Sequence, residues 1–163
     1  MANFSRGRAR AAAALGCGAL TLSLVACGAN GAAEVDDDDR PVVLTTFTVL
    51  ADVARNVAGD HLRVESIVRP GAEIHGYEPT PGDLRRTADA DLVLDNGLGL
   101  EQWFAQFVAT LDVPHVVVSE GVETVPIAEG TYADLPNPHA WMSPLNVQLY
   151  VDNMVTAFAE LDP

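Results

Sequence analysis

The sequence predicts an α/β fold, a single lobe in which a mostly parallel four-stranded sheet is flanked by helices. From residue 41 onward, short runs rich in β-branched residues alternate with helical segments, the pattern of strands joined by crossover helices. One run, "PHVVVSEG", is continuous in valine, as in a strand that is covered on both faces. The length of 163 residues suits one domain with a sizeable core.

The first half of the folded region contains two predicted strands and two predicted helices. In order, they are a strand at 42–47, a helix at 49–58, a strand at 62–68 and a helix at 80–88. Gly59 ends the first helix, and the second strand runs into a turn at Pro70-Gly71. Thr80 is a candidate N-cap for the short second helix, and Pro81 fits its first turn because the missing N–H does no harm there.

The second half repeats this alternation. In order, it contains a strand at 90–97, a helix at 101–111, a strand at 114–121 and a helix at about 146–161. The helix at 101–111 carries apolar side chains at helical spacing, which favours a core role over a binding stack; they are Trp103, Phe104, Phe107, Val108 and Leu111. Ser143 is the expected cap of the last helix.

The start of the chain has the pattern of an export signal, at residues 1–26. Three arginines precede an apolar stretch, 11–25, which is too short and too rich in Ala and Gly to favour a membrane span. The stretch ends in Leu24-Val25-Ala26-Cys27 and resembles the lipobox of bacterial lipoproteins, which implies a lipid anchor on Cys27. A plain secretory signal that happens to contain a cysteine is the alternative.

Residues 27–40 read as an acidic tether between the lipid and the folded lobe at 41–163. The tether has no apolar periodicity and carries four consecutive aspartates. The formal net charge of the chain is −14, and removal of three signal arginines would make it −17. Nucleic acid is therefore excluded as a partner, whereas a cation is electrostatically plausible; acidity is equally common as a solubility feature.

Two of the four histidines lie in proline-rich surroundings that restrict the backbone. They occur in "GAEIHGYEPTPGD", around His75, and in "LPNPHAWMSP", around His139. Both follow predicted strands, where α/β folds usually bind ligands, and a rigid imidazole suits a metal site. An ordinary hydrogen-bonding role is the alternative. His61 follows a turn and should be solvated, and His115 should open a buried strand.

Two separated motifs resemble one family. The stretch "IHGYEPTPGDLRRTADADLVLDNGLGLEQW" and the stretch "NPHAWMSP" are similar to those of the metal-binding lipoproteins that serve ABC transporters for zinc, manganese or iron. The resemblance extends from Val42 to Pro163. It departs from the family pattern at Asn137, where aspartate is usual.

The resemblance implies a function and a site. His75 and His139 would be the two imidazole ligands of a divalent metal ion, Zn²⁺ or Mn²⁺, and Glu78, Asn137 and Trp141 would support or shield it. A surface carboxylate at Glu78 and a packing role for Trp141 are the alternatives. The chain would be the extracytoplasmic substrate-binding component of an ABC transporter, anchored to the outer face of the cell membrane or periplasmic, with the membrane permease as its partner. A surface lipoprotein that acts in adhesion or buffers metal is the alternative.

The resemblance also implies a second lobe, which would supply a carboxylate or third histidine and an aspartate. Because the sequence stops at "AFAELDP", we expect this chain to be a fragment or truncated product with the first lobe alone. Two imidazoles alone should bind metal weakly. A hydrolytic enzyme is disfavoured because neither H-E-x-x-H nor G-x-S-x-G occurs in the sequence.

Overall fold

The structure is a computed structural model that describes residues 39–108 and 112–163. The predicted signal peptide, Cys27 and nearly all of the acidic tether lie outside the described residues. The strands are β1 (Val42–Thr45), β2 (Arg63–Ser66), β3 (Leu92–Asp95) and β4 (His115–Val117). The helices are α1 (Thr48–Ala58), α2 (Pro81–Ala88), α3 (Gln102–Val108), the short 3₁₀ helix η1 (Ala140–Met142) and α4 (Pro144–Leu161).

The four strands form one parallel sheet in the order β2-β1-β3-β4. The predicted fold class is thereby confirmed. The chain builds outward from β1 to β2, then crosses back to β3 and continues to β4 on the other side. The order therefore reverses between β1 and β3, and loops that leave the carboxyl ends of those strands diverge there, which is where open α/β sheets bind ligands.

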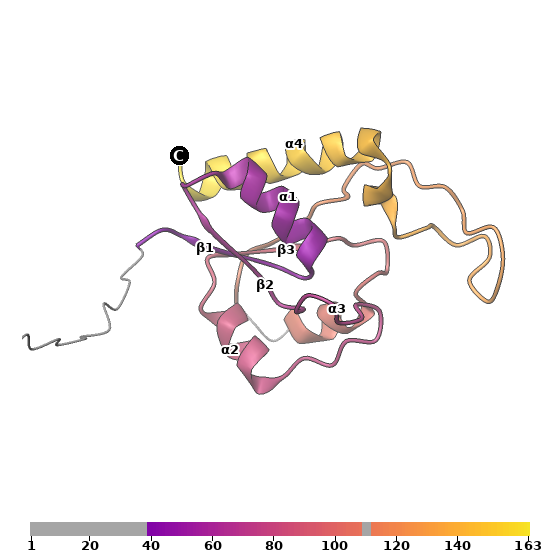
Figure 1. The fold of residues 1–163 in the computed structure, drawn as a ribbon, viewed down its shortest axis with the longest axis horizontal. Helices are drawn as coiled ribbons and strands as arrows, with labels where there is room; N and C mark the ends of the chain where they lie inside the picture. Colours follow the sequence, from indigo (N-terminus) through magenta and orange to yellow (C-terminus); the bar gives the residue numbers. More distant parts are fainter. Residues whose placement is uncertain (1–38, 109–111) are drawn as a thin grey trace, which may run out of the picture. The chain divides into compact units, whose positions relative to one another are not determined.

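Helices cover both faces of the sheet. Figure 1 shows α1 and α4 on one face and α2 and α3 on the other. Successive side chains of a strand point to opposite faces, so alternate residues of β1 belong to the two cores. Val43 packs in the core under α1 and α4. Leu44 packs in the other core, together with Phe104 and Phe107 of α3. Phe104 and Phe107 are buried, so their predicted core role is confirmed.

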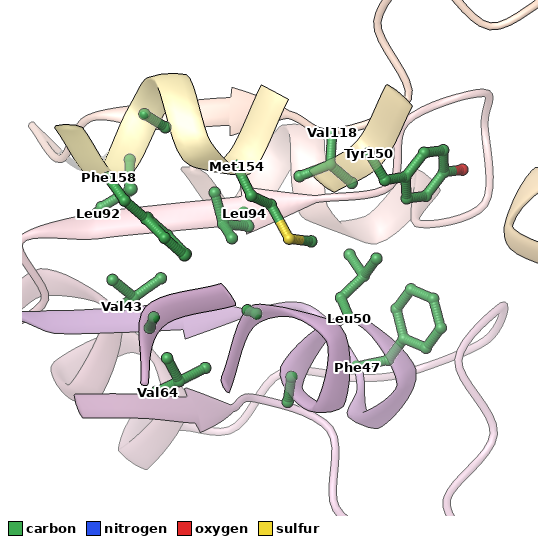
Figure 2. Packing of buried hydrophobic residues seen from close by; sticks show 14 of the residues in the cluster. Val43, Phe47, Leu50, Val64, Leu92, Leu94, Val118, Tyr150, Met154 and Phe158 are labelled. Carbon is green, nitrogen blue, oxygen red and sulfur yellow. The ribbon is translucent and has the colours of Figure 1, made fainter. Parts of the chain in front are cut away.

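The larger core lies between α4, α1 and the sheet. Figure 2 shows Met154 and Phe158 of α4 directed toward Leu92 and Leu94 of β3, with Leu50 of α1 beside them. All five side chains are buried. Burial of this apolar surface is the main source of stability, because each such side chain contributes about 1.5–3 kcal/mol when it leaves water.

One sequence prediction is wrong, the burial of β4, and another, the cap of α4, is confirmed only in its position. β4 is a three-residue edge strand with exposed or half-buried residues rather than a strand covered on both faces, and His115 at its start is exposed. Within residues 39–108 and 112–163, β4 pairs with β3 alone, and Val116 and Val117 are half-buried, whereas Val118, just after the strand, is fully buried. Ser143 precedes α4 as expected, but its side chain makes no cap hydrogen bond.

The turn after β3 requires glycine. Gly97 has φ +74°, and a Cβ there would collide with Cγ1 of Val117 in β4. This close approach of the turn to β4 brings residues 96–101 over the carboxyl edge of the sheet. Leu98 in the same turn also has a positive φ, of 57°, which is uncommon for a residue with a side chain.

Candidate metal centre

His75 and His139 lie next to each other at the carboxyl edge of the sheet. His75 follows β2 and His139 follows β4, the two edge strands, so their loops reach toward each other across the ends of β1 and β3. The centroids of the two imidazole rings are 5.3 Å apart, with an angle of 46° between the ring planes. The structure thus brings together the two residues that the sequence singled out.

The loop that carries His75 is fixed from both sides. Trp103 of α3 donates its indole N–H to the carbonyl of Ile74 at 2.9 Å. Beyond the histidine, the hydroxyl of Tyr77 donates to Oδ2 of Asp83 at 2.9 Å. Asp83 is itself held in a capping box with Thr80, in which each side chain bonds the other's backbone N–H. These bonds tie the loop to α3 on one side and to the amino end of α2 on the other, and the predicted Thr80 cap is confirmed.

The loop that carries His139 is attached to a buried polar cluster. Asn96 donates its side-chain N–H to the carbonyl of Pro138 at 3.0 Å. Tyr150 of α4 in turn donates its hydroxyl to Oδ1 of Asn96 at 2.7 Å. On the other side of the histidine, Asn146 of α4 donates to the carbonyl of Ala140 at 3.1 Å. The backbone around His139 is therefore coupled to both β3 and α4.

A side-chain oxygen two residues before each histidine contacts its ring. Oε1 of Glu73 is 2.6 Å from Nδ1 of His75, and Oδ1 of Asn137 is 2.8 Å from Nδ1 of His139. Hydrogen bonds from the backbone N–H groups of Gly76 and His75, and from the His75 ring, lower the pKa of Glu73 to about 2. Burial, and then the neighbouring His75, lower the pKa of His139.

The other two predicted supporting residues have different surroundings. Trp141 packs between Phe47 and His139, with ring centroids 4.9 and 5.3 Å away, and so covers one side of the His139 ring. Glu78 is exposed, and within residues 39–108 and 112–163 it makes no hydrogen bond to either histidine. Glu73, which the sequence analysis did not single out, is the carboxylate that contacts His75.

A cavity of about 520 Å³ opens beside the two histidines. The 97–100 turn contributes Leu98 and Leu100 to its wall, and the loop before His139 contributes Ile127, Tyr132 and Leu135. The wall is therefore mainly apolar apart from the two imidazoles.

The described residues bring two imidazole rings together in one place. No cluster of three or more His, Cys, Asp or Glu side chains that could hold a metal ion occurs in the part of the chain that the structure describes. The other two histidines lie elsewhere: His61 is 82% exposed, as predicted, and His115 lies at the start of β4. No helix among the described residues is long and apolar enough to cross a membrane.

Two buried carboxyl groups lie beneath the 97–100 turn. Glu101 accepts from the hydroxyl of Thr46 at 2.6 Å and from the backbone N–H of Asn96 at 2.8 Å, and burial raises its pKa. Burial, and then the charge of Glu101, raise the pKa of Asp95 to about 7. Oδ1 of Asp95 is buried without a hydrogen-bond partner in the described region, so no donor compensates for its burial.

Glu73, Asn96 and Trp103 are among the residues whose contacts with the two histidine loops were not predicted from the sequence. Glu73 and Asn137 each stand two residues before their histidine, and this shared spacing is a signal that the sequence contains. Asn96 and Trp103 lie in a recognisable motif, but their hydrogen bonds to carbonyls 42 and 29 residues away depend on the tertiary fold.

Known proteins share this fold and these motifs. Residues 43–163 match a family model described as ZnuA, zinc-uptake complex component A, periplasmic. The iron-binding protein YfeA of Yersinia pestis is 52% identical over 122 residues, which cover 74% of this chain and 39% of YfeA. The manganese-binding lipoprotein MntA of Halalkalibacterium halodurans is 38% identical over 147 residues, which cover 88% of this chain and 48% of MntA.

Solved structures agree with these matches. The Mn-bound periplasmic metal-binding protein from Candidatus Liberibacter asiaticus superposes with a TM-score of 0.69 at 34% identity, over 76% of this chain and 46% of that one. The chain spans about half the length of the relatives it matches. The family consists of binding proteins and not enzymes, as the sequence predicted. The chain belongs to the ZnuA family of metal-binding solute-binding proteins of ABC transporters.

Proposed function

We propose that this chain is the extracytoplasmic substrate-binding component of an ABC transporter for a divalent metal ion, and that His75 and His139 capture the ion. The observation that carries the proposal is the separation of 5.3 Å between the two ring centroids. An imidazole nitrogen bound at about 2.0–2.1 Å places its ring centroid about 3.2 Å from the ion, so two rings at a tetrahedral angle lie about 5.2 Å apart. This agreement between the two distances supports capture of one ion by both histidines.

The surroundings of the rings also support capture of a cation. In each loop, a backbone carbonyl next to the histidine accepts a hydrogen bond from a side chain elsewhere in the fold. The rings should therefore lose little conformational freedom when an ion binds. The chain has a formal net charge of −14, which favours the approach of a cation over that of an anion. The released ion would pass to a membrane permease, the partner that an ABC transporter requires.

The metal is Zn²⁺, Mn²⁺ or Fe²⁺. Neutral imidazole is a ligand for all three, so the two histidines do not choose among them. Fe²⁺ is included because the relative with 52% identity is named as an iron-binding protein. Other relatives are named for manganese.

Calorimetric titration with Zn²⁺ and with Mn²⁺ tests the proposal. The chain should bind one ion, and His75→Ala or His139→Ala should each weaken binding at least about tenfold, because each removes one of the two nitrogen ligands. His61→Ala and His115→Ala are matched controls, since both rings lie away from the site and should leave the affinity unchanged. Equal losses in the control variants, or unchanged binding in His75→Ala and His139→Ala, would contradict the proposal.

We propose further that Cys27 carries a lipid that holds the protein at the outer face of the membrane. Several relatives of this chain are named as lipoproteins. In a bacterial host the mature protein should fractionate with membranes, and its mass should exceed that of the peptide by the diacylglycerol and the added acyl chain. Cys27→Ser should yield a product without this added mass. A Cys27→Ser product that keeps the added mass would contradict the lipid anchor.

A further inference from the structure

His75 and His139 share one local arrangement. In each case, a single side-chain oxygen two residues earlier contacts both the backbone N–H and the ring Nδ1 of the histidine. Oε1 of Glu73 is 2.9 Å from the backbone nitrogen of His75 and 2.6 Å from Nδ1. Oδ1 of Asn137 is 3.0 Å from the backbone nitrogen of His139 and 2.8 Å from Nδ1.

This arrangement determines which ring nitrogen carries the proton. An ionised carboxylate can only accept hydrogen bonds, so Nδ1 of His75 must be the donor. Oδ1 of Asn137 already accepts the backbone N–H of His139, which identifies that atom as the oxygen and makes Nδ1 of His139 a donor as well. In a neutral imidazole with its proton on Nδ1, Nε2 keeps the free electron pair.

Glu73 is held in place by a third contact. Its second oxygen, Oε2, accepts the backbone N–H of Gly76 at 2.8 Å. The carboxylate therefore bridges two consecutive backbone N–H groups and the ring, although the side chain is 66% exposed. A side chain with both oxygens bound has a defined orientation, and it transmits that orientation to the His75 ring.

We propose that Glu73 is a positioning residue that fixes His75 in its Nδ1-protonated tautomer and so directs the free electron pair of Nε2 to the incoming cation. Asn137 acts in the same way on His139, with a neutral amide in place of the carboxylate. The inference about the tautomer rests on these contacts alone, and its consequence for metal binding rests on the proposed function.

Long-range ¹H–¹⁵N correlation spectra of the ¹⁵N-labelled chain test the tautomer without metal. The sample contains a chelator and is held at pH 8, and the exposed ring of His115 serves as an internal reference. We expect a protonated Nδ1 and an unprotonated Nε2 for His75 and His139. Glu73→Ala should release this preference at His75 and leave His139 unchanged. Glu73→Gln should restore it, because the amide oxygen can still accept both N–H groups.

Zinc titration of the same samples tests the consequence. Glu73→Ala should weaken binding about 10–100-fold, the usual cost of losing a group behind a ligand histidine, and Glu73→Gln should recover most of the loss. Glu78→Ala is the matched control, since that exposed glutamate lies three residues after His75 and contacts neither ring. It should change neither the tautomer nor the affinity.

Two results would overturn the inference. A proton on Nε2 of His75 in the unaltered chain, or a tautomer unchanged by Glu73→Ala, would show that Glu73 does not set it. If the tautomers behave as expected and no variant or unaltered chain binds Zn²⁺, Mn²⁺ or Fe²⁺, the proposed function fails separately, and Glu73 has no role in capture.

Discussion

The hydroxyl of Tyr150 stabilises the polar cluster that supports the His139 loop. Removal of this hydroxyl should lower the free energy of unfolding by an amount that can be estimated from its contacts. Tyr150 is fully buried, and its hydroxyl is 2.7 Å from Oδ1 of Asn96. Tyr150→Phe keeps the packing of the ring but leaves Oδ1 of the buried Asn96 without this donor. A buried acceptor without its donor costs about 1–3 kcal/mol. For a fold of this size that corresponds to a midpoint lower by about 4–12 °C.

Thermal and urea denaturation of the chain and of Tyr150→Phe measure this loss. Tyr132→Phe is the control, because Tyr132 is 63% exposed and should change stability by less than about 0.5 kcal/mol. In a double-mutant cycle, Tyr150→Phe should cost much less when Asn96→Ala is already present, since the acceptor is gone. The reasoning is refuted if Tyr150→Phe is neutral, or if its cost is the same with and without Asn96.

Three further predictions concern stability. The pKa of Asp95 is about 7 in the fold against an ordinary value of 3.8, so the folded state holds the proton more tightly, and the free energy of unfolding falls by up to about 4 kcal/mol as pH rises from about 4 to 7. Asp95→Asn should therefore reduce the dependence of the urea midpoint on pH between pH 5 and 8. An unchanged dependence would contradict this. Thr80→Ala should cost about 0.5–2 kcal/mol through loss of the α2 cap, with the exposed Thr131→Ala neutral in the same urea assay. Gly97→Ala should cost more than about 1 kcal/mol, because it combines a positive φ with a clash on Val117, and a neutral midpoint would show that the turn relaxes freely.

The fold class could be predicted from the sequence because the patterns that indicate strands, helices and caps are local. Alternation of strands and helices and the Thr80 cap with Pro81 are set by short-range chemistry, and the structure agrees with each. The position of a strand within the sheet is a tertiary property. The valine run at β4 therefore suggested burial, whereas the strand order places it at the edge with His115 exposed.

The candidate site was predictable only in part. The proline-rich contexts of His75 and His139 pointed to the two residues whose rings meet at 5.3 Å. Glu78 was expected to support the site, yet Glu73 makes the contact with His75, because an acceptor two residues before a histidine can reach both its backbone N–H and its ring. The bond from Asn96 to Pro138 joins residues 42 positions apart, so local sequence patterns could not reveal it.

X-ray absorption spectroscopy of the chain loaded with one equivalent of Zn²⁺ tests most directly whether His75 and His139 bind the same ion. For the unaltered chain we expect two imidazole nitrogens at about 2.0–2.1 Å from the zinc, with oxygen in the remaining positions. His75→Ala and His139→Ala should each leave one imidazole bound. A spectrum with no imidazole, or with two imidazoles that persist in both single variants, would contradict it.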